Sequence, residues 1–525
     1  MENPLNLWST PPTQHGSARL VSAAQAGLTR VKRPDSLTLP LGTYGFGGKL
    51  YGVPVAPSGQ HMLVLGPTRS GKTSRIYLPF LLTIADRPED RQQPTLVISD
   101  PKHELLSLAG PRLRAAGYQI HVVAPDQPTL SDQWNPLSSL HDDRGQLDHS
   151  ALWSLIDALV PKAHEADPYW IDNARLLLFG SCVAVGHAFG PQASLSEALA
   201  WSFRPADTLA YLQSRDPHVA FLLAGLLENV KENPRLLGTI LSELPGKLAV
   251  WMAPQILALY QNAGWDWSSV LAGGLHALFV SATPEQSPMA QLFWRQALNA
   301  LHQAQQRTGH LTRPALLLLD ELGNLGPIPQ FSRAVTTLAG AGVSIVAGLQ
   351  SVAQLQSIYG PAESEVLLSN LPLRIVLPGL DSPSGQWMSA HVGMGTQMVS
   401  QPQSSSDGRS SYTTSYVSRP VLTSDEISRL ASDSLLVQLL GKSATILRQR
   451  PYYRVRAWQA IAKLGHPRDG NIGSALDPWR HALGTPPDLE ALAKPLQHNA
   501  STAPDTVKKD ALLTLRKPER APERR

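Results

Sequence analysis

The sequence GPTRSGKT occupies residues 66–73 and fits the pattern G-x-x-x-x-G-K-[ST] at every fixed position. An apolar stretch, HMLVL, precedes it at residues 61–65, and residues 74–82 can form the helix that follows. The glycines of this pattern let backbone N–H groups surround phosphate oxygens, and the helix N-terminus adds the positive end of its dipole. The stretch therefore predicts a phosphate-binding loop that joins a strand to a helix.

Two side chains of the loop have expected roles in binding ATP and Mg²⁺. The ammonium of Lys72 is expected to reach the β- and γ-phosphates, and the hydroxyl of Thr73 is expected to hold Mg²⁺. A plain glycine-rich turn is the alternative, and the complete pattern argues against it. The residues expected to contact the nucleotide are Gly66, Pro67, Thr68, Arg69, Ser70, Gly71, Lys72, Thr73 and Ser74.

Polar side chains also follow two later apolar runs. Residues 315–319, ALLLL, lead into Asp320 and Glu321. Asp320 is expected to bind the Mg²⁺ shell directly or through water, and Glu321 to polarise the attacking water as general base. Gln350 ends another apolar run, where it either senses the γ-phosphate and orients water or is a turn residue at a strand end.

The order of apolar runs predicts an α/β fold with a parallel sheet and an inserted all-α domain. Strand-like runs and helical stretches alternate, except between about residues 145 and 265, where apolar residues recur only at helical spacing. Residues 399–416 are rich in Ser, Gln and Thr and are expected to form a loop. The predicted division is an irregular arm at 1–47, a nucleotide-binding domain at 48–145 and 266–464, an all-α insertion at 146–265, and a disordered tail at 465–525.

Composition limits the class of protein. The 525 residues carry a net charge of +4, which permits contact with nucleic acid without requiring it. Cys182 is the only cysteine, so no intramolecular disulfide forms and a reducing compartment is expected. No secretory signal opens the sequence, and its longest apolar run, residues 176–190, is shorter than the roughly 18 residues of a spanning helix. A cytoplasmic location without a membrane-spanning segment is therefore expected.

Several further stretches resemble the type IV coupling protein family of TraG/TraD-like conjugative ATPases. They are HGSAR at 15–19, DPKHE at 100–104, WNPL at 134–137, DPYW at 167–170, LDELGNLGPIPQF at 319–331 and GLQSVAQLQSIYG at 348–360. The resemblance implies a RecA-like motor with an all-α insertion that works as a homo-hexamer around DNA. It also implies that Gln350 is a nucleotide-sensing residue. From the residues alone, Asp100 and Pro101 are expected to cap a helix.

The sequence departs from the family pattern in three places. Only 14 residues precede the HGSAR segment, where the family has two membrane-spanning helices, and His103 replaces a glycine. Residues 339–341, AGA, stand where many relatives carry a basic residue that is proposed to reach a neighbour's nucleotide. Arg333 is the nearest arginine upstream, and a solvated helix charge is the preferred interpretation of it.

The expected function is an ATP-driven DNA translocase that delivers relaxase-bound DNA or an effector protein to a type IV secretion channel. DNA is expected to bind without sequence preference. A separate membrane protein is expected to recruit the chain to the membrane through the N-terminal arm, and the isolated chain to be monomeric until ATP and DNA are present. The alternatives are a non-motor adaptor that binds ATP, and a DNA-processing translocase of the wider FtsK/HerA-like group.

Overall fold

The computed structural model describes residues 15–31, 38–45, 48–54, 59–86, 93–141, 147–161, 168–232, 234–261, 264–404 and 410–465. They form two compact units. The described residues up to Trp134 and from Gly264 onward form a sheet unit, and Asn135–Ala263 form a helical unit. The expected arm before residue 15 and the expected tail after residue 465 lie outside the described residues.

One 12-stranded sheet organises the first unit, in the order β1-β3-β2-β14-β13-β10-β4-β9-β8-β5-β7-β6. Its central strands are parallel and almost completely buried, so they appear in the sequence as continuous apolar runs. This confirms the predicted parallel sheet. The parallel strands are β10 (Leu373–Val376), β4 (Met62–Leu65), β9 (Val343–Leu349), β8 (Ala315–Leu319), β5 (Thr95–Ser99), β7 (His276–Val280) and β6 (Gln119–Val123).

Antiparallel strands extend the sheet beyond β10. The prediction of an irregular arm through residue 47 is wrong for Thr38–Tyr44, which form β2, because Leu39 and Leu41 bury their side chains in the core. The pairing of β2 with β3 also shifts register between Pro40 and Gly42, and this shift interrupts the alternation of side chains between the two faces of the strand. The antiparallel strands are β13 (Ser434–Leu439), β14 (Thr445–Arg448), β2 (Thr38–Tyr44), β3 (Lys49–Pro54) and β1 (Thr29–Arg30).

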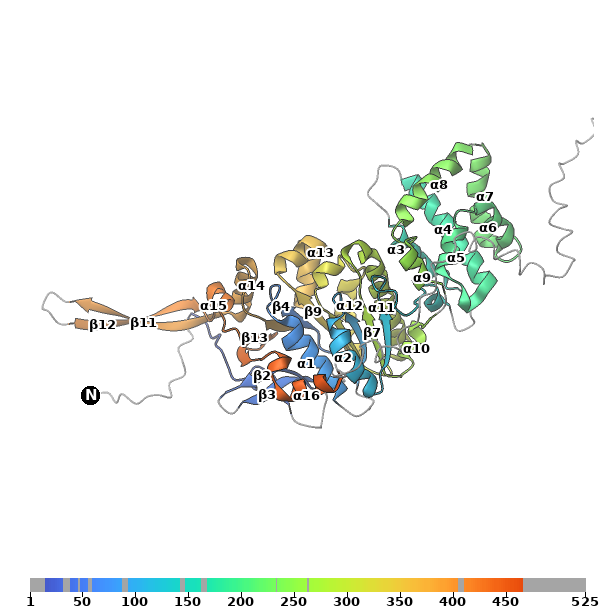
Figure 1. Cartoon of the computed structure of the whole chain (residues 1–525). Helices are drawn as coiled ribbons and strands as arrows, with labels where there is room; N and C mark the ends of the chain where they lie inside the picture. The colour runs from blue at the N-terminus through green and yellow to red at the C-terminus, as the bar shows by residue number, and fades with distance from the viewer. Residues whose placement is uncertain are drawn as a thin grey trace, which may run out of the picture. The chain divides into compact units, whose positions relative to one another are not determined.

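Helices cover both faces of the parallel strands, as Figure 1 shows. One face carries α1 (Leu78–Ala85), α2 (Glu104–Ala115) and α16 (Arg456–Gly465), which pack against one another over a continuous apolar core. The other face carries α11 (Ser287–Thr308), α12 (Phe331–Thr337) and α13 (Val352–Ser369). The unit also contains α10 (Trp267–Leu271), α14 (Ser382–Val392) and α15 (Ser424–Ser428).

The helical unit is built around α4 (Pro168–Phe189), which contacts most of its other helices. Cys182 is buried in α4, and burial raises the pKa of its thiol, as expected for a structural cysteine. The boundaries Asn135–Ala263 differ from the expected 146–265, because Trp265 packs with Trp134 of the sheet unit. The other helices are α3 (His149–Leu159), α5 (Leu195–Trp201), α6 (Pro205–Leu212), α7 (Pro217–Glu232), α8 (Pro234–Leu248) and α9 (Pro254–Leu259).

Among the described residues, one helix is long and apolar enough to cross a membrane, at Tyr169–Gln192, with a mean hydropathy of 1.2. This helix is longer than the apolar run at residues 176–190. Buried residues make up 61% of its most apolar window, because the other helices of the unit surround it. Its composition is therefore that of the core helix of a globular unit.

A separate hairpin of β11 (Met394–Ser404) and β12 (Ser410–Pro420) replaces the loop expected at residues 399–416 (Figure 1). The polar composition suggested a loop, but Thr, Tyr and Val favour strands, and the two strands pair continuously from Met394 with Pro420 to Ser404 with Ser410. The N-terminal segment lies against the base of this hairpin, where Ser17 bridges Gly395. A Cβ at Gly16 would lie 2.2 Å from the Met394 carbonyl oxygen, which explains the glycine there.

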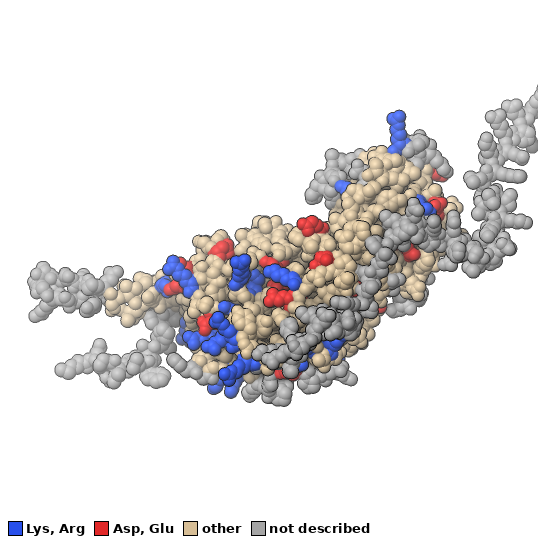
Figure 2. Space-filling view, in the orientation of Figure 1, with Lys and Arg blue, Asp and Glu red and all other residues tan. Residues whose placement is uncertain are grey.

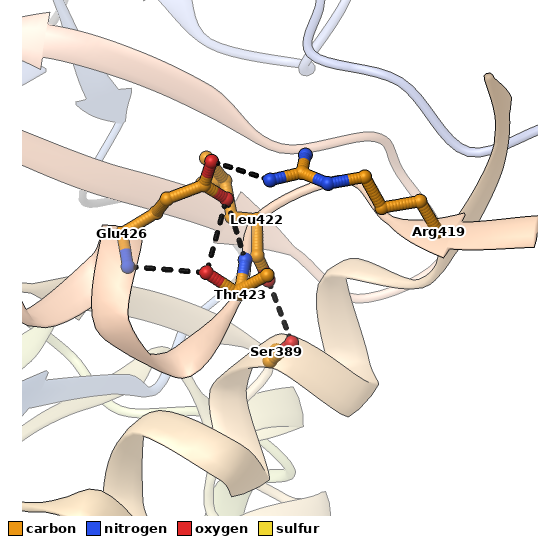
Figure 3. A network of polar contacts seen from close by, with 5 residues as sticks. All are labelled: Ser389, Arg419, Leu422, Thr423 and Glu426. Carbon is orange, nitrogen blue, oxygen red and sulfur yellow. Dashed lines mark hydrogen bonds and ion pairs between the residues drawn. The ribbon is translucent and has the colours of Figure 1, made fainter. Parts of the chain in front are cut away.

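Polar contacts fix the hairpin to the rest of the unit (Figure 3). Arg419, near the end of β12, pairs at 2.6 Å with Glu426 in α15 (Ser424–Ser428). Glu426 also accepts a hydrogen bond from the Thr423 backbone N–H at 2.8 Å, while the Thr423 hydroxyl accepts one from the Glu426 N–H at 3.2 Å. Ser389 of α14 donates to the Leu422 carbonyl at 2.6 Å. These contacts hold the end of β12 between two helices.

The replacement Thr423→Ala is expected to loosen this junction, because it removes the side chain that caps α15. The loss is about 1 kcal/mol, typical of an N-cap replacement. Amide hydrogen exchange over residues 421–428 should accelerate, while exchange in the parallel strands stays the same. Thr423→Ser keeps the hydroxyl and is the control. Equal exchange in the Ala variant and the native chain would show that the cap does not hold the junction.

Candidate nucleotide-binding site

The loop at residues 66–73 connects β4 to a short π-helix, η1 (Thr73–Tyr77), which continues into α1. The Gly66 N–H donates to the Leu349 carbonyl of β9 at 3.1 Å, which fixes the start of the loop. A Cβ at Gly66 would lie 2.7 Å from the Ser70 hydroxyl, and Gly71 has φ of +92°. Both glycines of the pattern are thus required, one by space and one by backbone conformation.

Lys72 spans the inside of this loop. Its Nζ donates to the carbonyl oxygens of Gly66 at 2.7 Å and Pro67 at 3.4 Å, and only 7% of the residue is exposed. Burial lowers the pKa of Lys72, while the nearby carboxylates of Asp320 and Glu321 oppose that shift. The ammonium is therefore held by neutral oxygens in a position where the oxygens of a phosphate would be stronger acceptors.

Asp320 and Thr73 meet next to the lysine. The Thr73 hydroxyl donates to the Asp320 carboxylate at 3.0 Å, although 247 residues separate them in the sequence. Burial raises the pKa of Asp320 to about 6, and the hydrogen bond from Thr73 and the charge of Lys72 oppose this shift. At neutral pH the pair offers a carboxylate and a hydroxyl oxygen, the ligand types that Mg²⁺ prefers. No group of three His, Cys, Asp or Glu in the described part of the chain forms an independent metal site.

Glu321 and Gln350 meet at the ends of neighbouring strands. The Gln350 Nε2 donates to the Glu321 carboxylate, and Glu321 has a left-handed backbone with φ of +69°. The close packing beneath them requires glycine at position 348, since a Cβ there would lie 2.3 Å from the hydroxyl of buried Tyr77 and 3.1 Å from the Glu321 nitrogen. In the sequence Gly348 is only one residue of an apolar strand, so its role in this packing was not predicted.

Asp100 and His103 border the site on the side of β5. The expectation that Asp100 is the N-cap is wrong in position, because α2 begins at Glu104 and His103 precedes it. Asp100 still accepts a hydrogen bond from the Leu106 N–H at 2.7 Å. His103 has φ of +54°, a backbone conformation that favours glycine.

The imidazole of His103 compensates for this backbone by contacting Asp126 at 3.0 Å. Burial alone would lower the pKa of His103, but the hydrogen bond and charge of Asp126 outweigh it and raise that pKa. Arg333 lies on the exposed side of α12. Burial lowers the pKa of His302, and the charge of Arg333 adds to that shift. That placement is the one expected for a solvated helix charge.

The structure thus brings Lys72, Thr73, Asp320, Glu321 and Gln350 to one edge of the sheet, at the carboxyl ends of β4, β8 and β9. The sequence profile of the family "Type IV secretory system Conjugative DNA transfer" matches residues 22–470. The protein VirD4 of Agrobacterium fabrum is 22% identical over 408 residues, which cover 75% of this chain and 59% of that protein. A conjugal transfer protein TraG of Escherichia coli is 22% identical over 457 residues, which cover 78% of this chain and 70% of that protein.

Solved structures of the plasmid coupling protein TrwB share the fold. The form in complex with sulphate has a TM-score of 0.58 and 19% identity, covering 84% of this chain and 96% of that chain. The form in complex with ADP and Mg²⁺ has a TM-score of 0.57 at the same identity and coverage. The predicted RecA-like sheet with an inserted helical domain is confirmed by this likeness. The chain spans 59% of the length of the VirD4 relatives, so their full activity does not transfer directly.

The raised pKa of Asp320 should make the stability of the folded chain depend on pH. In the unfolded chain its pKa is near the ordinary 3.8, whereas in the folded chain burial raises it to about 6. The folded chain therefore binds this proton more tightly than the unfolded chain does. The resulting stabilisation is complete below pH 3.8 and is lost as the pH rises through about 6. At neutral pH the ionised carboxylate destabilises the ligand-free fold by on the order of 1–3 kcal/mol.

The variant Asp320→Asn should consequently melt at a higher temperature than the native chain at pH 7.5 without ligand, and the difference should shrink at pH 5. Stabilisation by ATP with Mg²⁺ should be lost in the same variant. Thermal melting with and without these ligands measures both effects. Asp381→Asn, at an exposed carboxylate, is the control. A lower melting temperature for Asp320→Asn at pH 7.5 would contradict the assigned burial cost.

Proposed function

This chain belongs to the type IV secretory system conjugative DNA transfer family, and from that membership we propose that it is an ATP-driven DNA motor. As a coupling protein it would deliver relaxase-bound DNA or an effector protein to a type IV secretion or conjugation channel. The observation that supports this most is the convergence of Lys72, the Thr73–Asp320 pair and the Glu321–Gln350 pair at one sheet edge. The TrwB complexes with ADP and Mg²⁺, with a non-hydrolysable ATP analogue and with a non-hydrolysable GTP analogue support a purine nucleotide and Mg²⁺ for this site.

In the proposed reaction each side chain acts where the structure places it. Lys72 would exchange its carbonyl partners for the β- and γ-phosphate oxygens, and Thr73 and Asp320 would be ligands of Mg²⁺. Bound Mg²⁺ would neutralise the charge that develops on the phosphates. The Glu321 carboxylate accepts the proton of the attacking water. Glu321 has a left-handed backbone, and strain of this kind is concentrated at functional sites.

Gln350 would make the action of Glu321 as general base depend on bound nucleotide. Its amide is bonded to Glu321 in the structure, so the carboxylate is occupied when no phosphate is near. A γ-phosphate that accepts the Gln350 N–H would free the carboxylate of Glu321 for water. Hydrolysis would then start only after the triphosphate is in place.

DNA is proposed to bind without sequence preference in the channel of a homo-hexameric ring. The net charge of +4 is small for 525 residues. On the face drawn in Figure 2, Lys and Arg side chains are interspersed with Asp and Glu. The described residues on that face therefore form no continuous basic surface. Charges gathered from several subunits around a channel would supply the field that one chain lacks.

Replacing Glu321 with Gln should separate nucleotide binding from hydrolysis. The amide keeps the size of the side chain but cannot accept the proton, so the rate should fall by about 100-fold or more while ATP still binds. Lys72→Ala should lose ATP binding itself. Glu365→Gln, on the exposed side of α13, is the matched control for Glu321→Gln and should behave as the native chain. Unchanged DNA-stimulated turnover in both Glu321→Gln and Lys72→Ala would overturn the site, and ATP binding without any hydrolysis by the native chain would favour the adaptor.

Affinity for DNA should fall steeply with salt and depend little on sequence. Each phosphate that the protein neutralises releases counterions, giving a slope of log affinity against log salt of about −0.9 per contact on duplex DNA. Fluorescence anisotropy over a salt series, with one oligonucleotide and its scrambled version, measures both properties. An affinity that does not change with salt, or a strong preference for one sequence, would contradict backbone binding.

A further inference from the structure

The two sides of the phosphate loop differ, and this difference sets the direction of a bound nucleotide. Asp320, Glu321 and Gln350 lie on the side of β4 where β9 and β8 run, so the γ-phosphate and its metal belong there. The nucleoside must then extend toward the other side of β4, where β10, β13 and β14 follow. Strand β14 runs parallel to β4, because β13 is antiparallel to both β10 and β14. The residues after Arg448 thus emerge at the same edge of the sheet as the phosphate loop.

A half-buried arginine with unused donors lies on this side. Arg75 is in η1, and its side chain folds back under the loop, so that a Cβ at Gly71 would lie 3.1 Å from its Nε. The Nε and Nη1 atoms are buried, and neither has a hydrogen-bond partner among the residues described. Burial lowers the pKa of Arg75, whereas the nearby Tyr453 and Asp433 oppose that shift. A guanidinium in such a place is stabilised by any ligand that brings an acceptor.

The segment after β14, residues 449–454, lies against η1, and two hydrogen bonds of Gln449 fix it there. The Gln449 side chain is 2% exposed, and its Nε2 donates to the Arg75 carbonyl at 2.8 Å. The Gln449 N–H donates to the Asp433 carbonyl at 2.7 Å, which ties the segment to the start of β13. The chain then forms the short helix η7 (Tyr452–Arg454), which packs against η1.

An exposed aromatic ring stands on this segment. Tyr453 is 51% exposed, and its ring meets that of Tyr452 edge to face, with centroids 5.5 Å apart. The contact with Tyr452 limits the movement of the ring while leaving much of its surface open to solvent. A planar ring held beside a phosphate loop is suited to stack on a planar base.

We propose that Arg75 and Tyr453, on the frame supplied by Gln449, form the subsite for the nucleoside end of a nucleoside 5′-triphosphate. Tyr453 stacks on the purine base, and the guanidinium of Arg75 donates to acceptors of the nucleoside. This subsite rests on the proposed function, since it requires that the phosphates occupy the loop at residues 66–73. It adds a base-binding element from a distant part of the sequence, since 374 residues separate Arg75 from Gln449.

The test compares a ligand with a base and a ligand without one. Calorimetry on the full chain measures the affinities of ATP and of inorganic tripolyphosphate, each with Mg²⁺. Tyr453→Ala should weaken ATP binding by about 10-fold, the size of one lost stacking contact, and leave tripolyphosphate binding unchanged. Tyr453→Phe should retain ATP binding, because the ring is kept. Arg75→Met should also weaken ATP selectively.

Three outcomes would overturn the subsite. Unchanged ATP affinity in both Tyr453→Ala and Arg75→Met would show that neither side chain contacts the nucleoside. An equal loss for ATP and tripolyphosphate would show that the substitutions act through the phosphate loop. An equal loss of ATP binding in Tyr416→Ala, an exposed tyrosine of the hairpin, would show a non-specific effect. If the native chain binds no ATP at all, the proposed function fails together with the subsite, whereas ATP binding that depends on Lys72 but not on Tyr453 overturns only the subsite.

Discussion

The hydrogen-bonded register of β4, β9 and β8 is the constraint on which the site depends. Leu65 of β4 pairs with Leu349, and Leu319 of β8 pairs with Ala347, so the three strands end within about one dipeptide of each other. This register brings Asp320 to the Thr73 hydroxyl and Glu321 to the Gln350 amide. A shift of one residue in β8 would turn its carboxylates to the opposite face of the sheet.

Burial at this edge makes its charges depend on one another. Lys72 is buried and Asp320 is largely shielded from solvent, and each one's charge offsets part of the desolvation of the other. Carbonyl oxygens accept hydrogen bonds from Lys72, and the Thr73 hydroxyl donates one to Asp320. Phosphate and Mg²⁺ would be stronger partners for both groups. A bound nucleotide and its metal would therefore offset part of the desolvation of these two side chains.

Those parts of the fold that follow from local chemistry were predictable. The loop glycines, the apolar strand before them and the acidic pair after ALLLL place a phosphate site at a sheet edge without any structure. The strand β2 was missed because Pro40 and Gly42 interrupt its pattern, and the hairpin of β11 and β12 because its residues are polar and little of it belongs to a core. Arg75 and Tyr453 were missed because only the antiparallel extension of the sheet, which long-range pairing decides, brings them together. The sequence identified the chemistry at the phosphates but not the frame around the rest of the nucleotide.

The central claim is that this site drives movement along DNA. The most direct measurement follows the displacement of a bound obstacle after ATP and Mg²⁺ are added. On duplex DNA the obstacle is a third strand, and on a biotinylated single strand it is streptavidin. The account predicts that the obstacle is removed from at least one of these tracks with ATP and remains with a non-hydrolysable analogue. Steady hydrolysis of ATP on bound DNA with both obstacles left in place would contradict it.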